Sequence, residues 1–304
     1  MGQALLAHQC TVSRQLVHRS GLGEVLLTGW RAVGTDSFLV GAQWPRAHAF
    51  YEPVAGAHDP LLTPETIRQA GLLLAHTEYQ VPLDHVPCLR ELSYDIDAAA
   101  LPFGPAPAEL LLHVVASEVH RRGPDAFGLR LQVEVYLDDV RIGGGAARFD
   151  WLAPGLHERL RAHRPAPART ALPAPVAASL AGRSRGCDVV LAATEQPRQW
   201  ELRADPAHPV LFDEHDADGA DGCVPGQLLL EAVRQACHCA EGDGAALLPL
   251  SLSARFLHHA ELDAPVRLSV TPPHGLPGGD RVLEVRAEQH GRTVADATVR
   301  VRRG

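Results

Sequence analysis

The sequence predicts an α+β fold in which one unit, an apolar helix wrapped by an antiparallel sheet, occurs twice. Two observations predict it. The hexapeptides ETIRQA and EAVRQA, at residues 65–70 and 231–236, repeat a Glu-X-X-Arg-Gln-Ala pattern inside apolar stretches. Segments typical of strands follow each hexapeptide in the same order. Such an internal repeat indicates a duplicated unit, so the two halves should share one topology.

A proline-rich stretch separates the two halves of the 304-residue chain, a length that suits two domains. Residues 164–179 hold four prolines and no periodic apolar face, which is typical of a linker. We therefore expect an N-terminal domain at residues 1–163 and a C-terminal domain at residues 180–304.

The segments before the two helices match in order. RSGLGEVLL, from Arg19, corresponds to RSRGCDVVL, from Arg183. In both, a carboxylate lies five residues after the arginine, and an apolar strand follows. WPRAHAFY at 44–51 then corresponds to ADPAHPVLF at 204–212, and each is expected to end a strand with His-X-apolar. One strand is thus expected before a long loop to each helix.

The two helices, in IRQAGLLLAH and QLLLEAVRQACHCA, are apolar nearly all round, as expected if a sheet covers most of each helix. About four strands should follow each helix, the last two joined by a turn that contains glycine. We expect Gly143–Gly145 to form a turn or bulge, because a nucleotide-binding strand-loop-helix context is lacking. Together these elements predict a tandem double hotdog, paired as a pseudo-dimer whose sheets join edge to edge.

Composition excludes several classes of function. The sequence has no Lys and no Asn, and all 28 of its basic residues are Arg. Schiff-base enzymes and P-loop enzymes need lysine, and a papain-type triad needs asparagine. The net charge of −8 argues against a nucleic-acid partner. The sequence shows no signal peptide and no apolar run long enough to span a membrane, so we expect a cytoplasmic protein whose six cysteines are reduced.

Each helix begins with a Glu–Arg pair on one face, Glu65 with Arg68 and Glu231 with Arg234. One interpretation is two inert buried ion pairs. The other is that the pairs line a cleft at the pseudo-dimer interface. There a glutamate with a raised pKa can act as a base, and an arginine can hold a phosphate or carboxylate. The loops before the helices should deliver unpaired N–H groups that stabilise an oxyanion.

Several motifs resemble the A-factor biosynthesis (AfsA-type) hotdog family, the γ-butyrolactone signal synthases of actinobacteria. They are VHR, EVLLTGW, WPRAHAFY, HDPLLTPETIRQAG, VLFD and VPGQLLLEAVRQA. The resemblance implies an acyltransferase. It would move a β-ketoacyl group from an acyl-carrier-protein thioester to the hydroxyl of dihydroxyacetone phosphate, and the ester can then condense to a butenolide. It implies no metal and no organic cofactor.

With this chemistry in view, we predict Glu65 as the base and Arg234 as the main substrate-binding cation, supported by Arg68 and Glu231. The predicted substrate-binding residues are Gln69, Gln235, His58 and Arg19, the last as a phosphate contact. The oligomeric state is left open between a monomeric pseudo-dimer and a homodimer. The alternatives are a hotdog dehydratase or thioesterase acting on acyl-carrier substrates, and a non-catalytic acyl- or lactone-binding protein.

The second half departs from the family pattern in the loop before its helix. Cys223 stands directly before Val-Pro, where the family usually has histidine, and the loop is longer. His215 is a candidate replacement, whereas a nucleophilic role for Cys223 is disfavoured. Cys237-His238-Cys239 does not predict a metal site, because neighbouring residues of a helix point in different directions. His76 and His238 are expected to be core histidines.

Overall fold

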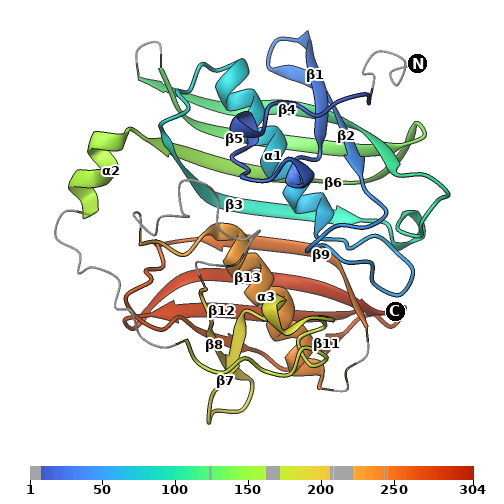
Figure 1. Ribbon diagram of the computed structural model, residues 1–304, viewed down its shortest axis with the longest axis vertical. Coiled ribbons are helices and arrows are strands. Elements are labelled where there is room, and N and C mark those ends of the chain that lie inside the picture. The colour runs from blue at the N-terminus through green and yellow to red at the C-terminus, as the bar shows by residue number, and fades with distance from the viewer. Residues whose placement is uncertain are drawn as a thin grey trace. The chain divides into compact units, whose positions relative to one another are not determined.

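The computed structural model of the chain describes residues 8–122, 125–161, 172–205, 208, 222–242, 244 and 246–304. It divides into two compact units, Met1–His163 and Arg164–Gly304 (Figure 1). Residues 164–171 of the predicted linker lie outside the described residues. None of the described helices is long and apolar enough to cross a membrane.

The first unit wraps six antiparallel strands around helix α1, Leu62–Thr77, in the order β1-β2-β4-β5-β6-β3. Short 3-10 helices η2 (Arg14–Val17) and η3 (Leu22–Glu24) precede the sheet, and helix α2 (Pro154–Arg161) follows it. The strands are β1 Leu27–Gly34, β2 Ser37–Trp44, β3 Val86–Ile96, β4 Ala108–Arg122, β5 Asp125–Leu137 and β6 Val140–Leu152.

The second unit repeats this plan around helix α3, Gly226–Glu241, with the strand order β9-β13-β12-β10-β8-β7. A short η5 (Gly186–Asp188) leads into its sheet, as η3 does in the first unit. The strands are β7 Leu191–Ala193, β8 Gln199–Leu202, β9 Leu247–Phe256, β10 Arg267–Val270, β12 Arg281–Gln289 and β13 Arg292–Arg303. A two-residue strand β11, His274–Gly275, pairs with β12.

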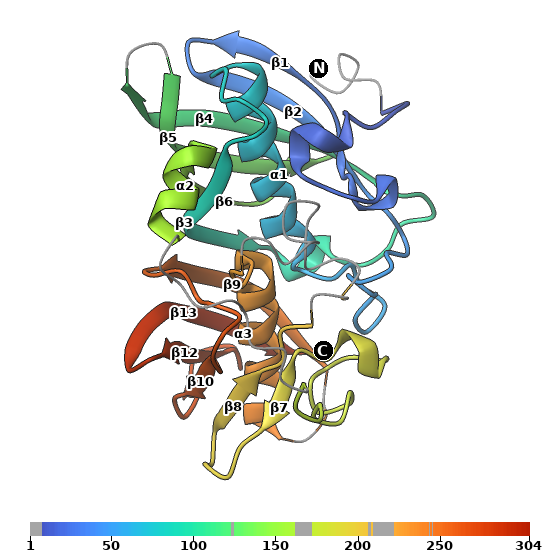
Figure 2. The ribbon, with the colours of Figure 1, turned by 60° about the vertical axis from the view of Figure 1, so that its left-hand side comes forward.

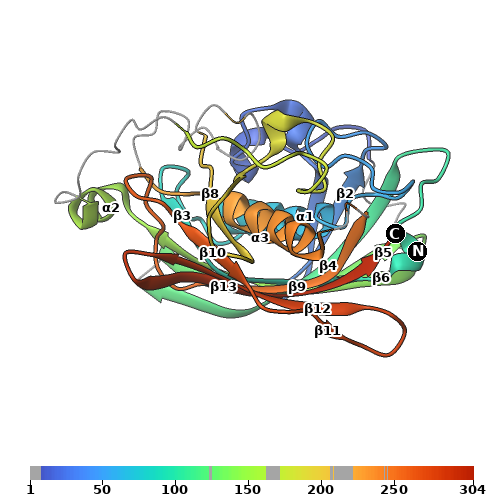
Figure 3. The same ribbon diagram turned by 90° about the horizontal axis from the view of Figure 1, so that it is seen from below.

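Both helices are buried on nearly all sides, as their apolar sequences predict. Every residue of α1 from Leu62 to Ala75 is buried, as is every residue of α3 from Leu228 to His238. In each unit the helix lies along the concave face of its own curved sheet (Figures 2 and 3). This is the hotdog arrangement, and its occurrence twice confirms the predicted tandem double hotdog.

The prediction of one strand before each helix is wrong. A hairpin of two strands, β1–β2 or β7–β8, precedes each helix instead. β2 ends at Trp44, so His48 lies in the loop beyond the strand and not at its end. β8 ends at Leu202, so the corresponding His208 also lies beyond its strand.

The glycine run is part of a strand and not a turn. Gly143–Gly145 lies inside β6, and the turn before it is formed by Asp138 and Asp139, both with positive φ. A Cβ at Gly145 would collide with the Ser93 carbonyl on the neighbouring strand β3. The run therefore permits the close backbone approach by which the sheet curves around α1. The matching turn of the second unit, at His290-Gly291, contains glycine as predicted.

Candidate active site

The Glu65 carboxylate, near the start of α1, is buried and is held by three side chains. Arg68, one helical turn later, donates from Nε to Oε2 at 3.0 Å and from Nη2 to Oε1 at 3.0 Å. Arg19, just after η2, approaches Oε1 with its Nη2 at 2.7 Å. The Nε2 of Gln69 donates to the same oxygen at 2.6 Å. We call Arg19, Glu65, Arg68 and Gln69 the Glu65 cluster.

The carboxamide of Gln69 also ties α1 to the segment that leads into β1. Its Oε1 accepts the main-chain N–H of Leu26 at 2.9 Å, and its Nε2 donates to the carbonyl of Glu24 at 2.8 Å. A buried amide that satisfies two main-chain groups and a carboxylate at once fixes its neighbours in one arrangement. The cluster therefore connects the helix to the chain before the sheet.

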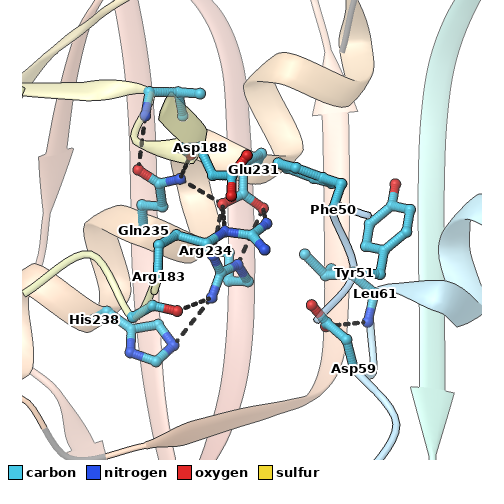
Figure 4. Close-up of polar contacts among 12 residues, drawn as sticks. Phe50, Tyr51, Asp59, Leu61, Arg183, Asp188, Glu231, Arg234, Gln235 and His238 are labelled. Atoms are coloured by element: carbon cyan, nitrogen blue, oxygen red, sulfur yellow. Dashed lines mark hydrogen bonds and ion pairs between the residues drawn. The ribbon is translucent and has the colours of Figure 1, made fainter. Parts of the chain in front are cut away.

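The second unit contains the same arrangement around Glu231 (Figure 4). Arg183 approaches Oε2 with its Nη2 at 2.7 Å, and Arg234 donates from Nε to Oε2 at 3.0 Å. Gln235 donates to Oε1 at 2.5 Å. We call Arg183, Glu231, Arg234 and Gln235 the Glu231 cluster. The contacts confirm that the segments from Arg19 and Arg183 correspond, as the repeat predicts.

The bridging role of the glutamine is repeated as well. The Oε1 of Gln235 accepts the N–H of Val190 at 2.9 Å, and its Nε2 donates to the carbonyl of Asp188 at 2.8 Å. Asp188 and Glu24 are the carboxylate residues five positions after the two arginines. Their main-chain carbonyls accept the hydrogen bonds from the two cluster glutamines.

The two cluster carboxylates ionise easily. Burial alone would raise the pKa of Glu65, but the charges and hydrogen bonds of Arg19 and Arg68 outweigh it and lower the pKa to about 2. The same balance, with Arg183 and Arg234, lowers the pKa of Glu231 to about 2. The expectation of a raised glutamate pKa is therefore wrong. Because each cluster holds two guanidinium groups against one carboxylate, each has a positive balance of charge.

The start of α1 does not supply the expected unpaired N–H groups. Asp59 accepts the N–H of Leu61 at its Oδ1, at 2.9 Å, and the N–H of Leu62 at its carbonyl, at 3.0 Å (Figure 4). The N–H of Thr63 donates to the carbonyl three residues earlier, and the next residue is a proline. The N–H of Glu65 is also bonded, to the Leu61 carbonyl. Residues 209–221, which lead to α3, lie outside the described residues.

His48 holds the loop that follows β2, a role that the sequence did not reveal. Its Nδ1 accepts the N–H groups of Phe50 and Tyr51, each at 3.1 Å, and its Nε2 lies 3.2 Å from a Glu24 carboxylate oxygen. The corresponding His208 lies 3.9 Å from Asp188. The shared His-X-apolar pattern marked both histidines, but nothing in the sequence named their partners.

His58 has a different environment from the other buried histidines. Its ring lies between Trp44 and Phe103, with ring centroids at 5.7 and 4.7 Å. Burial lowers its pKa, which favours the neutral imidazole. Its Nδ1 is buried and has no hydrogen-bond partner among the residues that the structure describes. His58 thus lies outside the Glu65 cluster, with an open ring nitrogen.

The model of the A-factor biosynthesis hotdog domain matches residues 3–152 and 166–303 of this chain. The chain belongs to the A-factor biosynthesis hotdog family. A relative from Streptomyces virginiae, a 2-oxo-3-(phosphooxy)propyl 3-oxoalkanoate synthase, is 40% identical over 96% of this chain and 98% of its own length. A synthase of the same name from Streptomyces griseus is 36% identical, covering 93% of both chains.

Solved structures show that the fold of this A-factor family member is shared more widely. A putative oleoyl thioesterase from Lactobacillus plantarum matches with a TM-score of 0.51 and 11% identity, covering 90% of this chain and 99% of its own. The 12:0-ACP thioesterase from Umbellularia californica has a TM-score of 0.51 and 9% identity, covering 88% and 94%. At these identities the likeness shows the hotdog fold alone.

The predicted site residues of this family member fall into three places. Arg19, Glu65, Arg68 and Gln69 meet in one cluster, and Glu231, Arg234 and Gln235 meet in the other, whereas His58 stands apart. The prediction omitted Arg183. The repeat had placed it opposite Arg19, so the signal was present.

The remaining polar candidates of the second unit have ordinary surroundings. Burial raises the pKa of Cys237 to about 12 and that of Cys239 to about 11, which favours the protonated thiols. Cys223 is half-buried, with its Sγ 3.9 Å from His259 Nδ1. The predicted replacement, His215, lies outside the described residues.

The two histidines expected to lie in the core make internal contacts. His76 lies with its Nε2 2.8 Å from that of His18 and its Nδ1 2.7 Å from the Val81 carbonyl. His238 lies with its Nε2 3.4 Å from Arg234 Nη1, and burial with the nearby arginine charge lowers its pKa to about 3. His238 is buried, as predicted for a core histidine, whereas His76 is only half-buried and the core prediction is wrong for it.

Proposed function

We propose that this protein transfers a 3-oxoacyl group to the hydroxyl of dihydroxyacetone phosphate. The product would be a 2-oxo-3-(phosphooxy)propyl 3-oxoalkanoate, the compound for which its relatives are named. One observation carries the proposal: four curated relatives bear this synthase name, at 35–40% identity over 93–96% of this chain. The match extends through both units and does not stop at a shared fold.

The reaction is an acyl transfer without a change of oxidation state. The acceptor hydroxyl oxygen attacks the thioester carbonyl carbon, the carbon–sulfur bond breaks, and the hydroxyl proton ends on the released thiol. Such a step needs a cation for the phosphate, stabilisation of the oxyanion and a group that accepts the proton. Arginine is the only strongly basic side chain that this sequence offers for the phosphate.

The positive balance of charge in the two clusters supports a role in holding the triose phosphate. Arg68 is the proposed substrate-binding cation of the first unit and Arg234 that of the second, with Glu65 and Glu231 holding them in place. A glutamate whose pKa is about 2 is a weak base at neutral pH, so Glu65 would act through its charge more than as a proton acceptor. Gln69 and Gln235 would fix each carboxylate, and Arg19 would act through Glu65.

The donor and the setting are further parts of the proposal. We propose an acyl-carrier-protein thioester as the donor, because a β-ketoacyl group is activated in that form during chain assembly. The ester would then condense to a butenolide. The expected cytoplasmic location and the choice between a monomeric pseudo-dimer and a homodimer remain predictions.

The direct test is to incubate the purified protein with a 3-oxoacyl thioester of acyl-carrier protein and dihydroxyacetone phosphate. Mass spectrometry would follow the phosphorylated ester, and a thiol reagent would follow release of the carrier. We expect the ester to form at the rate of thiol release, and thiol release to depend on the triose phosphate. Free 3-oxo acid in place of the ester would instead identify a thioesterase. Absence of both products would identify a binding protein.

A further inference from the structure

The loop that enters α1, together with the first turn of α1, contains buried polar atoms that none of the described residues satisfies. The side chains of His58 and Thr63 are 3% and 0% exposed, and neither His58 Nδ1 nor Thr63 Oγ1 has a hydrogen-bond partner among the described residues. An unpaired buried polar atom destabilises a fold by about 1–3 kcal/mol. Such atoms are uncommon in native proteins, and two so close in the chain, one in the loop and one in the first helical turn, point to a bound water or ligand.

Trp44 connects His58 to the first turns of α1. The indole Nε1 donates to Thr66 Oγ1 at 2.9 Å, and the indole ring also packs on the ring of His58. Thr63 is three residues before Thr66, so the two threonines share one helix face. Through Trp44, the ring of His58 is thus connected to the helix face that carries Thr63.

Tyr51 adds a hydrogen-bond donor to this loop. Its phenol is buried, with Glu65 and Asp59 close enough to affect it, and burial is the main reason that its pKa lies well above the ordinary value. The phenol therefore stays protonated at neutral pH. His48 holds this part of the loop in place, because its Nδ1 accepts the N–H groups of Phe50 and Tyr51.

The second unit has apolar residues where the first has these polar ones. Counted back from the two cluster glutamates, His58 corresponds to Val224 and Thr63 to Leu229, and both of these are buried. The fold therefore accepts an apolar side chain at each position. A polar group that the fold does not need, left without a partner, indicates a ligand.

We propose that Tyr51, His58 and Thr63 of the first unit form the subsite for the triose-phosphate acceptor, and that His58 is its catalytic base. This inference rests on the proposed function. The His58 imidazole takes the proton of the acceptor hydroxyl as its oxygen attacks the thioester carbonyl carbon. It then returns the proton to the departing thiolate, so that the imidazole ends as it began. The Thr63 hydroxyl and the Tyr51 phenol hold the acceptor by hydrogen bonds.

The first experiment compares His58→Gln with the wild type in the acyl-transfer assay, with His113→Gln as a control. His113 is a half-exposed histidine on β4, away from this loop. We expect kcat to fall about 100-fold or more in His58→Gln, as is usual on loss of a general base. The acid limb of the kcat/KM pH profile, due to protonation of His58, should disappear. The control should keep the wild-type rate and profile.

The second experiment uses Thr63→Val, which removes the orphan oxygen and preserves the shape of the side chain. We expect thermal stability equal to or above that of the wild type, together with a KM for dihydroxyacetone phosphate about 5- to 10-fold higher, the usual effect of one lost hydrogen bond. The Thr63→Val variant still tests the subsite if His58→Gln fails to fold.

The outcomes separate the inference from the proposed function. Wild-type kcat and pH profile in a folded His58→Gln would overturn the base assignment. An unchanged KM in Thr63→Val, whatever its stability, would mean that Thr63 does not contact the acceptor, and would overturn the subsite. No ester from the wild type would refute the proposed function itself.

Discussion

The two units share one buried cluster and differ in the loops that lead to their helices. Around Glu65 and Glu231 the same residue types make the same contacts, down to the glutamine that bridges the main chain. Around the helix starts, His58 and Thr63 stand opposite Val224 and Leu229. The cluster is thus common to both copies, and the region around the helix start is where one copy has polar groups that the other lacks.

The largest expected effect comes from removing a cluster carboxylate. Glu65→Gln and Glu231→Gln each leave two buried guanidinium groups without their counter-charge. We expect each change to lower the free energy of unfolding by about 3–5 kcal/mol, and by similar amounts in the two units. Denaturant unfolding followed by circular dichroism measures this. An effect below 1 kcal/mol in one unit would show that the two clusters are not equivalent.

Low pH should remove the stabilisation that the ionised Glu65 carboxylate contributes to the fold. The pKa of Glu65 is about 2 in the folded protein against an ordinary value of 4.5. A lowered folded pKa stabilises the fold fully above the ordinary value, and this contribution is lost as pH falls toward the folded value. The difference in unfolding free energy between the wild type and Glu65→Gln should therefore shrink by roughly 3 kcal/mol between pH 4.5 and pH 2. A difference that stays constant over this range would contradict the assigned pKa.

The bridging glutamines should have smaller effects. Gln69→Met and Gln235→Met each leave the N–H of Leu26 or Val190 without its present acceptor. We expect a loss of about 1–3 kcal/mol in each case, the usual cost of an unsatisfied buried group. Amide hydrogen exchange at those two N–H groups provides a local readout. Unchanged protection there would rule out the bridge as the reason for any lost stability.

Cys223→Ser should have the smallest effect, because a half-buried thiol that is not a nucleophile can be replaced at little cost. We expect the rate of ester formation to stay within about twofold of the wild type, and stability within about 0.5 kcal/mol. A 100-fold loss in rate, or an acylated Cys223 in the intact-protein mass spectrum, would show that Cys223 takes part in the reaction and that the reaction takes place in the second unit.

The sequence was sufficient for the fold, because the repeat and the all-round apolar helices are properties of local segments. It also named seven of the eight cluster residues and contained the signal for the eighth, Arg183. The sequence did not predict properties that depend on contacts between residues far apart in the chain, such as a pKa or a hydrogen-bond partner. The pKa of Glu65 depends on Arg19, 46 residues away. The partners of His48 and the open ring nitrogen of His58 likewise follow from tertiary packing.

The central claim is that the two units have divided the work, with the polar acceptor handled by the loop of the first. The most direct measurement is the rate of ester formation at saturating substrates in His58→Gln and in Val224→Ala, its counterpart in the second unit. We predict a loss of about 100-fold or more in the first and a rate within about threefold of the wild type in the second. Equal losses in both, or none in His58→Gln, would contradict the division.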